Sequence, residues 1–232
     1  MNKYTAEIPV RLGSKRVPKK NLRLINGKPM VAYVIEASIG SKYINQTYIN
    51  SEAKIMERIA NEYNIKFYQR RPELALDHIT QDEFNYDFLC NIATENLVLV
   101  NPVSPLVLSE DIDNAIDYYE KNRLDTLISI REEKLQSFYQ NKPLNFSIND
   151  LLPMTQNLNP IQLCAWTVCI WNAKKFIEYY EKNGFAVFVG NYGLYSFDRL
   201  RSLKVSTEEE FQIAELYLKL KKNNLAGVKY YE

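Results

Sequence analysis

Short apolar runs alternate with amphipathic stretches from the start of the chain to about Ile130. The run 97–100 is apolar at every position, which is typical of a parallel strand buried on both faces. Apolar residues in 30–39 recur at the spacing of one helix face. The pattern predicts strands over 4–10, 47–50, 65–68, 97–100 and 126–130, with helices over 30–39, 51–63, 80–92 and 109–122. This alternation predicts an α/β fold: a Rossmann-like, mostly parallel sheet with helices on both faces.

The second half of the chain begins with a segment of different character. Residues 135–160 are rich in Asn, Gln and Pro and show no clear period. We interpret them as an insertion or a dimerisation arm within a single domain that spans residues 1–232. After this arm the pattern predicts strands over 163–171, 186–189 and 202–205, a helix over 173–183 and a last helix that follows the capping box 207–210.

Composition narrows the class of protein. The chain has 232 residues, of which 46% are hydrophobic and 25% charged, as in a folded globular domain. It lacks the roughly 20 consecutive apolar residues of a membrane helix, and its first residues contain no apolar signal core. Three cysteines without a Cys-x-x-Cys pair, together with one histidine, argue against a zinc site and against a disulfide framework. We therefore expect a cytoplasmic protein with no membrane partner.

Basic residues gather in one segment although the formal net charge is only +1. The window 11–28 contains no acidic residue and holds seven basic ones: Arg11, Lys15, Arg16, Lys19, Lys20, Arg23 and Lys28. This local excess indicates an anion site, whereas the neutral total argues against nucleic acid as a partner. The window follows the first predicted strand directly, so it would lie at the carboxyl edge of the sheet, where ligands bind in such folds.

The loop 11–22 carries groups suited to a nucleotide. Gly13 lets the backbone approach a ligand, Ser14 adds a hydroxyl, and backbone N–H groups of such a loop can cradle phosphate oxygens. Charge-assisted bonds to a triphosphate are available from Arg11, Lys15 and Lys20. The loop has neither the Gly-Lys-Ser/Thr of a P-loop nor Gly-x-Gly-x-x-Gly, which disfavours P-loop kinases and dinucleotide binding.

Several blocks with fixed spacing carry a family resemblance. The opening block contains Arg11, Ser14, Lys15, Pro18, Lys20 and Asn21, and is followed by Asn-Gly-Lys-Pro at 26–29. Further blocks are Arg-Pro-Glu-Leu-Ala at 71–75, Asn-Pro-Val-Ser-Pro-Leu at 101–106 and the closing segment 208–215. With these blocks the chain resembles the acylneuraminate cytidylyltransferase family, whose members activate acidic sugars such as sialic acids by joining them to CMP from CTP. The resemblance covers nearly the whole chain and is weakest in the arm.

The resemblance implies a role for each matching residue. Arg11, Lys15 and Lys20 would hold the CTP phosphates, and we take Arg11 and Lys20 as the catalytic candidates. Gly13, Ser14, Asn21 and Arg71 would complete the nucleotide site, with the last two near the cytidine. Asn101 and Ser104 would meet the sugar acid. A sugar hydroxyl would attack the α-phosphorus of CTP and release pyrophosphate, and the protein would be a homodimer.

The chain departs from the family pattern at the metal site. The closing strand of the family carries Asp-Ile-Asp, whose carboxylates hold magnesium, and Lys204 and Ser206 stand at those positions here. A lysine cannot bind a hard cation, so Mg²⁺ stays a possible cofactor without its family ligands. Near the expected sugar site the family's small residues are replaced by the bulkier 165–167, Ala-Trp-Thr.

Two functions from different classes therefore stay open. The first is a cytidylyltransferase acting on a sialic-acid-like sugar or a related 2-keto acid. The second is a catalytically impaired nucleotide-binding protein on the same fold, which the residues at 204 and 206 favour. A nucleic-acid binder that uses the basic loop is a third reading, and the net charge and the absence of a binding motif argue against it.

Overall fold

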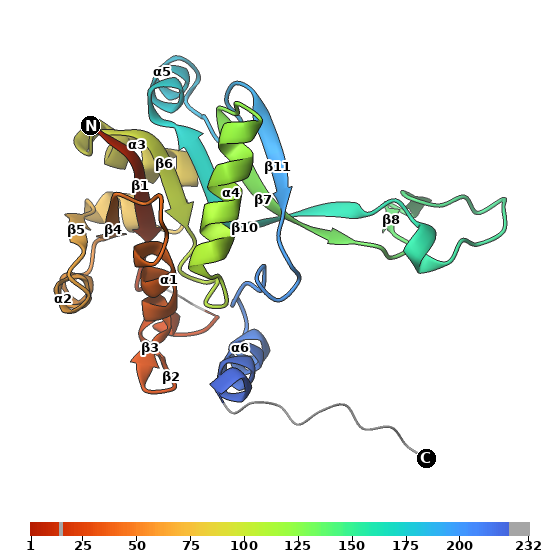
Figure 1. Ribbon diagram of the computed structural model, residues 1–232, viewed down its shortest axis with the longest axis horizontal. Helices are drawn as coiled ribbons and strands as arrows, with labels where there is room; N and C mark the ends of the chain where they lie inside the picture. The colour runs from red at the N-terminus through yellow and green to blue at the C-terminus, as the bar shows by residue number, and fades with distance from the viewer. Residues whose placement is uncertain (14–15, 223–232) are drawn as a thin grey trace.

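A seven-stranded sheet forms the centre of the molecule (Figure 1), as a computed structural model that describes residues 1–13 and 16–222 shows. Its strand order is β11-β7-β10-β6-β1-β4-β5. The strands are β1 (Asn2–Pro9), β4 (Gln46–Ser51), β5 (Lys66–Gln69), β6 (Thr94–Val100), β7 (Thr126–Glu133), β10 (Ile161–Asn172) and β11 (Tyr192–Ser196). All neighbours pair in parallel except β10, which is antiparallel to both β6 and β7. The expected mostly parallel α/β sheet is confirmed.

Helices cover both faces of this sheet. The α-helices are α1 (Met30–Ile39), α2 (Lys54–Glu62), α3 (Gln81–Asn91), α4 (Ser109–Lys121), α5 (Ala173–Asn183) and α6 (Glu208–Lys222). One core contains the buried residues of α1, α2 and α4 against β1 and β4, and a second core lies beneath α3 and α5. In Figure 1, α1 and α4 stand in front of the sheet. Burial of these two apolar faces is what fixes the layers.

Short elements connect and extend this framework. They comprise three 3-10 helices and two small hairpins: η1 (Lys20–Leu22), η2 (Pro72–Ala75), η3 (Thr155–Asn157), β2 (Leu24–Ile25) with β3 (Lys28–Pro29), and β8 (Phe138–Tyr139) with β9 (Lys142–Pro143). The first 3-10 helix and first hairpin follow the basic loop. They lie directly before α1.

The segment 135–160 forms an arm. Figure 1 shows β7 and β10 leading away from the body, with β8 part of the way along the arm. The arm exposes several large apolar side chains, Leu151 being 96% exposed and Ile148 68% exposed. It is continuous with β7 and β10 and contains no buried apolar cluster of its own among the described residues. The arm is therefore an extension of β7 and β10 away from the sheet.

Some boundaries and strands differ from the sequence prediction. Residues 186–189 form a loop with a turn at 187–188 and not a strand, and the edge strand is β11 instead. Residues 202–205 are irregular as well, although Val205 N–H donates to the carbonyl of Val103 at 2.8 Å. Ser51 ends β4, and α2 begins only at Lys54. The apolar residues of 186–189 and 202–205 belong to loops that pack on the core. Their sequence pattern is the same as that of a short buried strand, so it does not distinguish the two.

The two capping boxes are confirmed. Thr80 Oγ1 accepts from Glu83 N–H at the start of α3, and Glu83 accepts from the backbone of Thr80 in return. At the start of α6, Glu210 N–H donates to Thr207 Oγ1, and the Thr207 N–H donates to Glu210 Oε2. Such reciprocal bonds satisfy helix N–H groups that would otherwise lack partners, and they fix where each helix begins.

Candidate functional site

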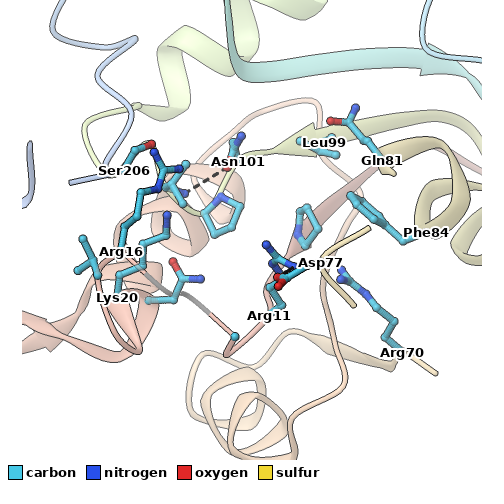
Figure 2. Close-up of a pocket in the computed structure, with 16 residues that line it drawn as sticks. Arg11, Arg16, Lys20, Arg70, Asp77, Gln81, Phe84, Leu99, Asn101 and Ser206 are labelled. Atoms are coloured by element: carbon cyan, nitrogen blue, oxygen red, sulfur yellow. Dashed lines mark hydrogen bonds and ion pairs between the residues drawn. The ribbon is translucent and has the colours of Figure 1, made fainter. Parts of the chain in front are cut away.

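A pocket of about 600 Å³ lies beyond the carboxyl ends of β1 and β6. Its walls come from the basic loop, η1, the segment after β5, the start of α3, the loop after β6 and the segment before α6. Figure 2 shows Arg16, Lys20 and Ser206 on one side and Arg70, Phe84 and Gln81 on the opposite side. This is the edge at which open α/β sheets bind ligands.

Lys20 stands at the cationic side of the pocket. Its Nζ donates to the carbonyl of Val205 at 2.9 Å, which ties η1 to the segment before α6. Burial, together with the positive charges of Arg16, Lys204 and Arg11, lowers the pKa of Lys20 to about 8, against the opposing charge of Glu210. Clustered cations in a partly buried wall favour a bound anion.

Hydrogen bonds hold the backbone of the basic loop at Leu12 and at Lys20. Leu12 N–H donates to Glu52 Oε1 at 3.0 Å, and Lys20 N–H donates to the carbonyl of Val17 at 3.3 Å. Nothing lies within 4 Å of the point where a Cβ on Gly13 would stand. Gly13 therefore borders open space in the pocket wall. The predicted ligands Ser14 and Lys15 lie outside the described residues.

Arg11 lines the pocket between its two sides. Its Nη1 donates to Asp77 Oδ1 at 2.9 Å, across the gap between the basic loop and the segment before α3. Both side chains are partly exposed, so this pair contributes little to stability. Its main consequence is geometric, because it joins two loops that border the same pocket.

A series of hydrogen-bonded, buried polar side chains supports the side of the pocket opposite Lys20. Arg70 is only 3% exposed, yet it lines the pocket. Its Nε donates to Asn50 Oδ1 and its Nη2 to the Asn50 carbonyl, each at 2.9 Å. Asn50 Nδ2 in turn donates to Glu7 Oε1 at 2.6 Å. The guanidinium also lies 4.6 Å from the ring centre of Phe84, within cation–π range.

Arg71, the predicted nucleotide residue, lies outside the pocket lining. Its Nη2 donates to Asp87 at 2.8 Å, and the side chain is 66% exposed. Arg70 continues the strand pairing of β5, since its N–H donates to the carbonyl of Ser51. Successive side chains of an extended segment point in opposite directions, so only one of the two arginines can face the pocket. The structure places Arg70 there.

The two residues predicted to bind the sugar acid differ in burial, and only one of them lines the pocket. Asn101 lines the pocket, but its Nδ2 donates to the carbonyl of Trp166 at 3.1 Å, and its Oδ1 accepts from Val103 N–H. Ser104 is fully buried, outside the pocket lining, and its Oγ has no hydrogen-bond partner among the described residues. Trp166 has φ of 59°, at a register shift in β10. The Asn101 side chain is thus already hydrogen-bonded to the backbone of this irregular strand.

Asn21 differs from these two residues. It lines the pocket and is 4% exposed, and its buried Oδ1 has no hydrogen-bond partner within the described chain. Gln81 Nε2 is likewise buried and unpaired within that part of the chain. Buried polar atoms without partners are costly unless a ligand or water satisfies them. Both side chains border the pocket, so both indicate a polar ligand.

The residues at the family's metal position do not fit a magnesium site. Lys204 is exposed and adds positive charge next to Lys20. Ser206 lines the pocket, but its N–H is bound by Glu210, which caps α6. Asp77 is engaged by Arg11, and no group of three or more His, Cys, Asp or Glu side chains that could hold a metal occurs in 1–13 and 16–222. Magnesium needs several hard oxygen ligands, which this wall does not offer.

Arg16, Arg70, Gln81 and Phe84 line the pocket, although the sequence pattern assigns none of them an individual role in the site. The capping box at Thr80 places the first turn of α3 at the pocket, and that signal could have pointed to Gln81 and Phe84.

Glu7 supplied a further signal. It is an isolated acid in an otherwise buried strand, 0% exposed, beneath the pocket. A carboxylate in such a strand needs a polar partner inside the protein. It therefore marks a buried polar network, and Asn50 and Arg70 form that network.

The architecture is that of a doubly wound α/β domain with a cationic pocket at the carboxyl edge of its sheet. The chain matches the family described as Cytidylyltransferase over residues 6–229, and it belongs to that family.

Individual relatives agree with this assignment, and a solved structure has a similar fold. The N-acylneuraminate cytidylyltransferase of Streptococcus agalactiae serotype V is 28% identical over 213 residues, which cover 88% of this chain and 50% of that protein. The CMP-N,N'-diacetyllegionaminic acid synthase of Legionella pneumophila is 27% identical over 184 residues, covering 75% of this chain and 79% of that protein. A CMP:2-keto-3-deoxy-manno-octonic acid synthetase solved with CTP has a TM-score of 0.71 at 12% identity, with 94% of this chain and 98% of that chain covered.

The chain spans about half the length of several of the N-acylneuraminate cytidylyltransferases that it matches. The described residues contain no helix with the length and apolar character needed to cross a membrane.

Proposed function

We propose that this protein transfers CMP from CTP to the hydroxyl of an acidic sugar and releases pyrophosphate. The observation that carries the proposal is the cationic pocket, in which Arg11, Arg16 and Lys20 border about 600 Å³ at the carboxyl edge of the sheet. Membership of the cytidylyltransferase family and the names of the relatives support CTP and a sialic-acid-like sugar or a related 2-keto acid as substrates.

The chemistry asks for positioning and for neutralised charge. A sugar hydroxyl oxygen would attack the α-phosphorus, and the bond from that phosphorus to the bridging oxygen would break, so that pyrophosphate leaves. Negative charge builds on the phosphate oxygens during this step, and preorganised cations stabilise it best where water is excluded. Arg11 and Lys20 are the catalytic candidates, because both line the pocket and Lys20 is partly desolvated.

The other site assignments are proposals as well. Gly13 and Asn21 border the space for the nucleotide, and Ser14 and Lys15 belong to the same loop. Arg70 takes the place expected of Arg71. Asn101 would present its pocket face to the sugar acid. Ser104 would shape the floor of that site from beneath, because it is buried.

Magnesium is not assigned to residues of this protein. The exposed Lys204 and the capped segment around Ser206 offer no carboxylate pair, so we propose that fixed cations carry most of the phosphate charge. A metal ion that arrives with the nucleotide would be held by phosphate oxygens, as part of the substrate.

The alternative is a nucleotide-binding protein without transferase activity. The same two residues, Lys204 and Ser206, favour it, because they replace carboxylates that hold magnesium in the family to which the sequence is similar. Pyrophosphate release decides between the two functions. Purified protein is incubated with CTP and a panel of acidic sugars, and pyrophosphate and CMP-sugar are measured. Release that depends on one sugar supports the transferase, and tight CTP binding without release supports the alternative.

We also propose that the arm mediates a homodimer. Its exposed apolar side chains, Leu151 and Ile148 among them, would be covered by the same arm of a second copy. Sedimentation at micromolar concentration tests this proposal: a dimer that becomes a monomer in the double variant Ile148→Asp, Leu151→Asp supports it. A wild-type monomer contradicts it.

A cytoplasmic location is proposed from the thiols. Cys90 and Cys164 are exposed and unpaired, and Cys169 is buried and unpaired. Exposed free thiols suit a reducing compartment.

A further inference from the structure

Glu7 is unusual among the described residues that support the pocket, because it is a fully buried carboxylate in the middle of a core strand. Its Oε1 accepts from Asn50, whereas its Oε2 is buried with no hydrogen-bond partner among the described residues. Burial raises the pKa of Glu7 to about 7, although the positive charge of Arg70 and the Asn50 hydrogen bond act in the opposite direction. A buried, half-satisfied carboxylate destabilises a fold, so its presence calls for another role.

The hydrogen-bond donors and acceptors of Glu7, Asn50 and Arg70 show what that role is. An ionised carboxylate can only accept hydrogen bonds. Facing Glu7, the Asn50 amide must therefore present its Nδ2, and its Oδ1 then faces Arg70 Nε. With a neutral amide in place of Glu7, Asn50 could turn over and offer its NH₂ group to the guanidinium, which has no acceptor. The ionised Glu7 and the Arg70 guanidinium thus require the same orientation of Asn50, with Nδ2 toward the carboxylate and Oδ1 toward the guanidinium.

Arg70 is the end of this chain that meets the pocket. Asn50 holds its Nε and Nη2, and the ring of Phe84 lies beside the guanidinium. Within the described residues, Nη1 has no hydrogen-bond acceptor, although the residue is 3% exposed and lines the pocket. A guanidinium group that is held on one side and has free N–H groups on the other is preorganised for a ligand with hydrogen-bond acceptors.

We propose that Glu7 is a positioning residue for nucleotide binding, which acts through Asn50 to hold Arg70 against the nucleotide. The inference rests on the proposed nucleotide site. It concerns residues of β1 and β4 that lie beneath the pocket and do not line it.

A double-mutant cycle on CTP affinity tests the proposal. Binding of CTP is measured by titration calorimetry at pH 8 for the wild type, Glu7→Gln, Arg70→Lys and the double variant. We expect Arg70→Lys to weaken binding about tenfold or more, and Glu7→Gln about threefold or more, as for the loss or loosening of a charge-assisted hydrogen bond. The double variant should bind no more weakly than Arg70→Lys, because Glu7 has no effect without the arginine.

Controls separate this role from general damage to the fold. Glu95→Gln changes an exposed glutamate of β6, and Arg58→Lys changes an exposed arginine of α2, and both should bind CTP like the wild type. Each variant is melted without ligand to confirm that it folds. If Glu7 has a purely structural role, Glu7→Gln weakens CTP binding by the same factor in the wild type and in Arg70→Lys. That additivity would overturn the proposal, as would an unchanged CTP affinity of Glu7→Gln. Absence of CTP binding by the wild type would overturn the proposed nucleotide site and this inference together.

Discussion

Lys20 Nζ donates to the backbone carbonyl of Val205 at 2.9 Å, and this bond joins η1, which follows the basic loop, to the segment before α6. The contact orients the ammonium group beside the pocket and places it near the charge of Lys204. Two segments far apart in the sequence thereby form one cationic wall.

Replacing Lys20 by alanine removes one cation from this wall. We expect Lys20→Ala to weaken CTP binding about tenfold or more, because it deletes a charge-assisted phosphate contact and leaves the Val205 carbonyl without its donor. Calorimetric titration with CTP measures the change. Lys174→Ala, on the exposed face of α5, is the matched control. Equal affinities of Lys20→Ala and the wild type would remove Lys20 from the site.

The pKa of Lys20 predicts how nucleotide affinity depends on pH. Its value of about 8 in the ligand-free protein means that the amine loses its charge as the pH rises through 8. CTP affinity should therefore hold steady from pH 7 to about 8 and fall above it. Lys20→Arg keeps its charge throughout this range, so its affinity should not fall in the same way. The same decline in both proteins would assign the pH effect to another group.

The same residue affects the stability of the ligand-free protein. Its folded pKa lies below the ordinary value of 10.5, so the unfolded chain binds more protons between pH 8 and 10.5. The contribution of Lys20 to the free energy of unfolding accordingly rises with pH in that window.

The variant Lys204→Asp tests whether the lysine at this position explains why the pocket wall offers no magnesium site. The substitution removes a positive charge from the neighbourhood of Lys20 and supplies a hard oxygen ligand. We expect CTP to bind the wild type with little dependence on magnesium, and the variant to bind severalfold more tightly with magnesium than with EDTA. Thermal-shift titrations with CTP in the two conditions measure this. A wild type that binds CTP only with magnesium would show that other groups hold the ion.

Glu7→Gln should stabilise the fold at neutral and higher pH. The folded pKa of about 7 lies above the ordinary 4.5, so the native state binds more protons between those values, and stability falls as the pH rises through them. The substitution removes this penalty, so the variant should melt at a higher temperature than the wild type at pH 8, with a smaller difference at pH 5. Thermal melts at both values check the sign. A lower melting temperature at pH 8 would mean that the Asn50 bond outweighs the cost of burial.

The sequence predicted the layers of the fold because apolar periodicity records which faces are buried. It did not predict that β10 runs antiparallel between β6 and β7, since a buried strand has the same pattern in either direction. The apolar residues of 186–189 pack in a loop against the core, and their burial without hydrogen-bonded pairing looks the same in the sequence as that of a strand.

Pocket residues could be predicted where they belong to a sequence block with fixed spacing. Arg11, Gly13, Lys20 and Asn21 belong to such a block, and all four line the pocket. The choice between Arg70 and Arg71 depends on how far the extended backbone continues after β5, which the residue types do not reveal. The link from Glu7 to Arg70 runs through Asn50, 43 positions after Glu7, and only the parallel pairing of β1 with β4 brings them together.

The most direct test of the central claim is pyrophosphate release from CTP by the purified protein with an acidic sugar of the sialic or 2-keto acid class. The account predicts release that requires both CTP and the sugar, that yields the CMP-sugar in equal amount, and that drops sharply in Lys20→Ala. CTP binding with no release for any sugar of these classes would contradict the transferase and leave a nucleotide-binding protein on the cytidylyltransferase fold.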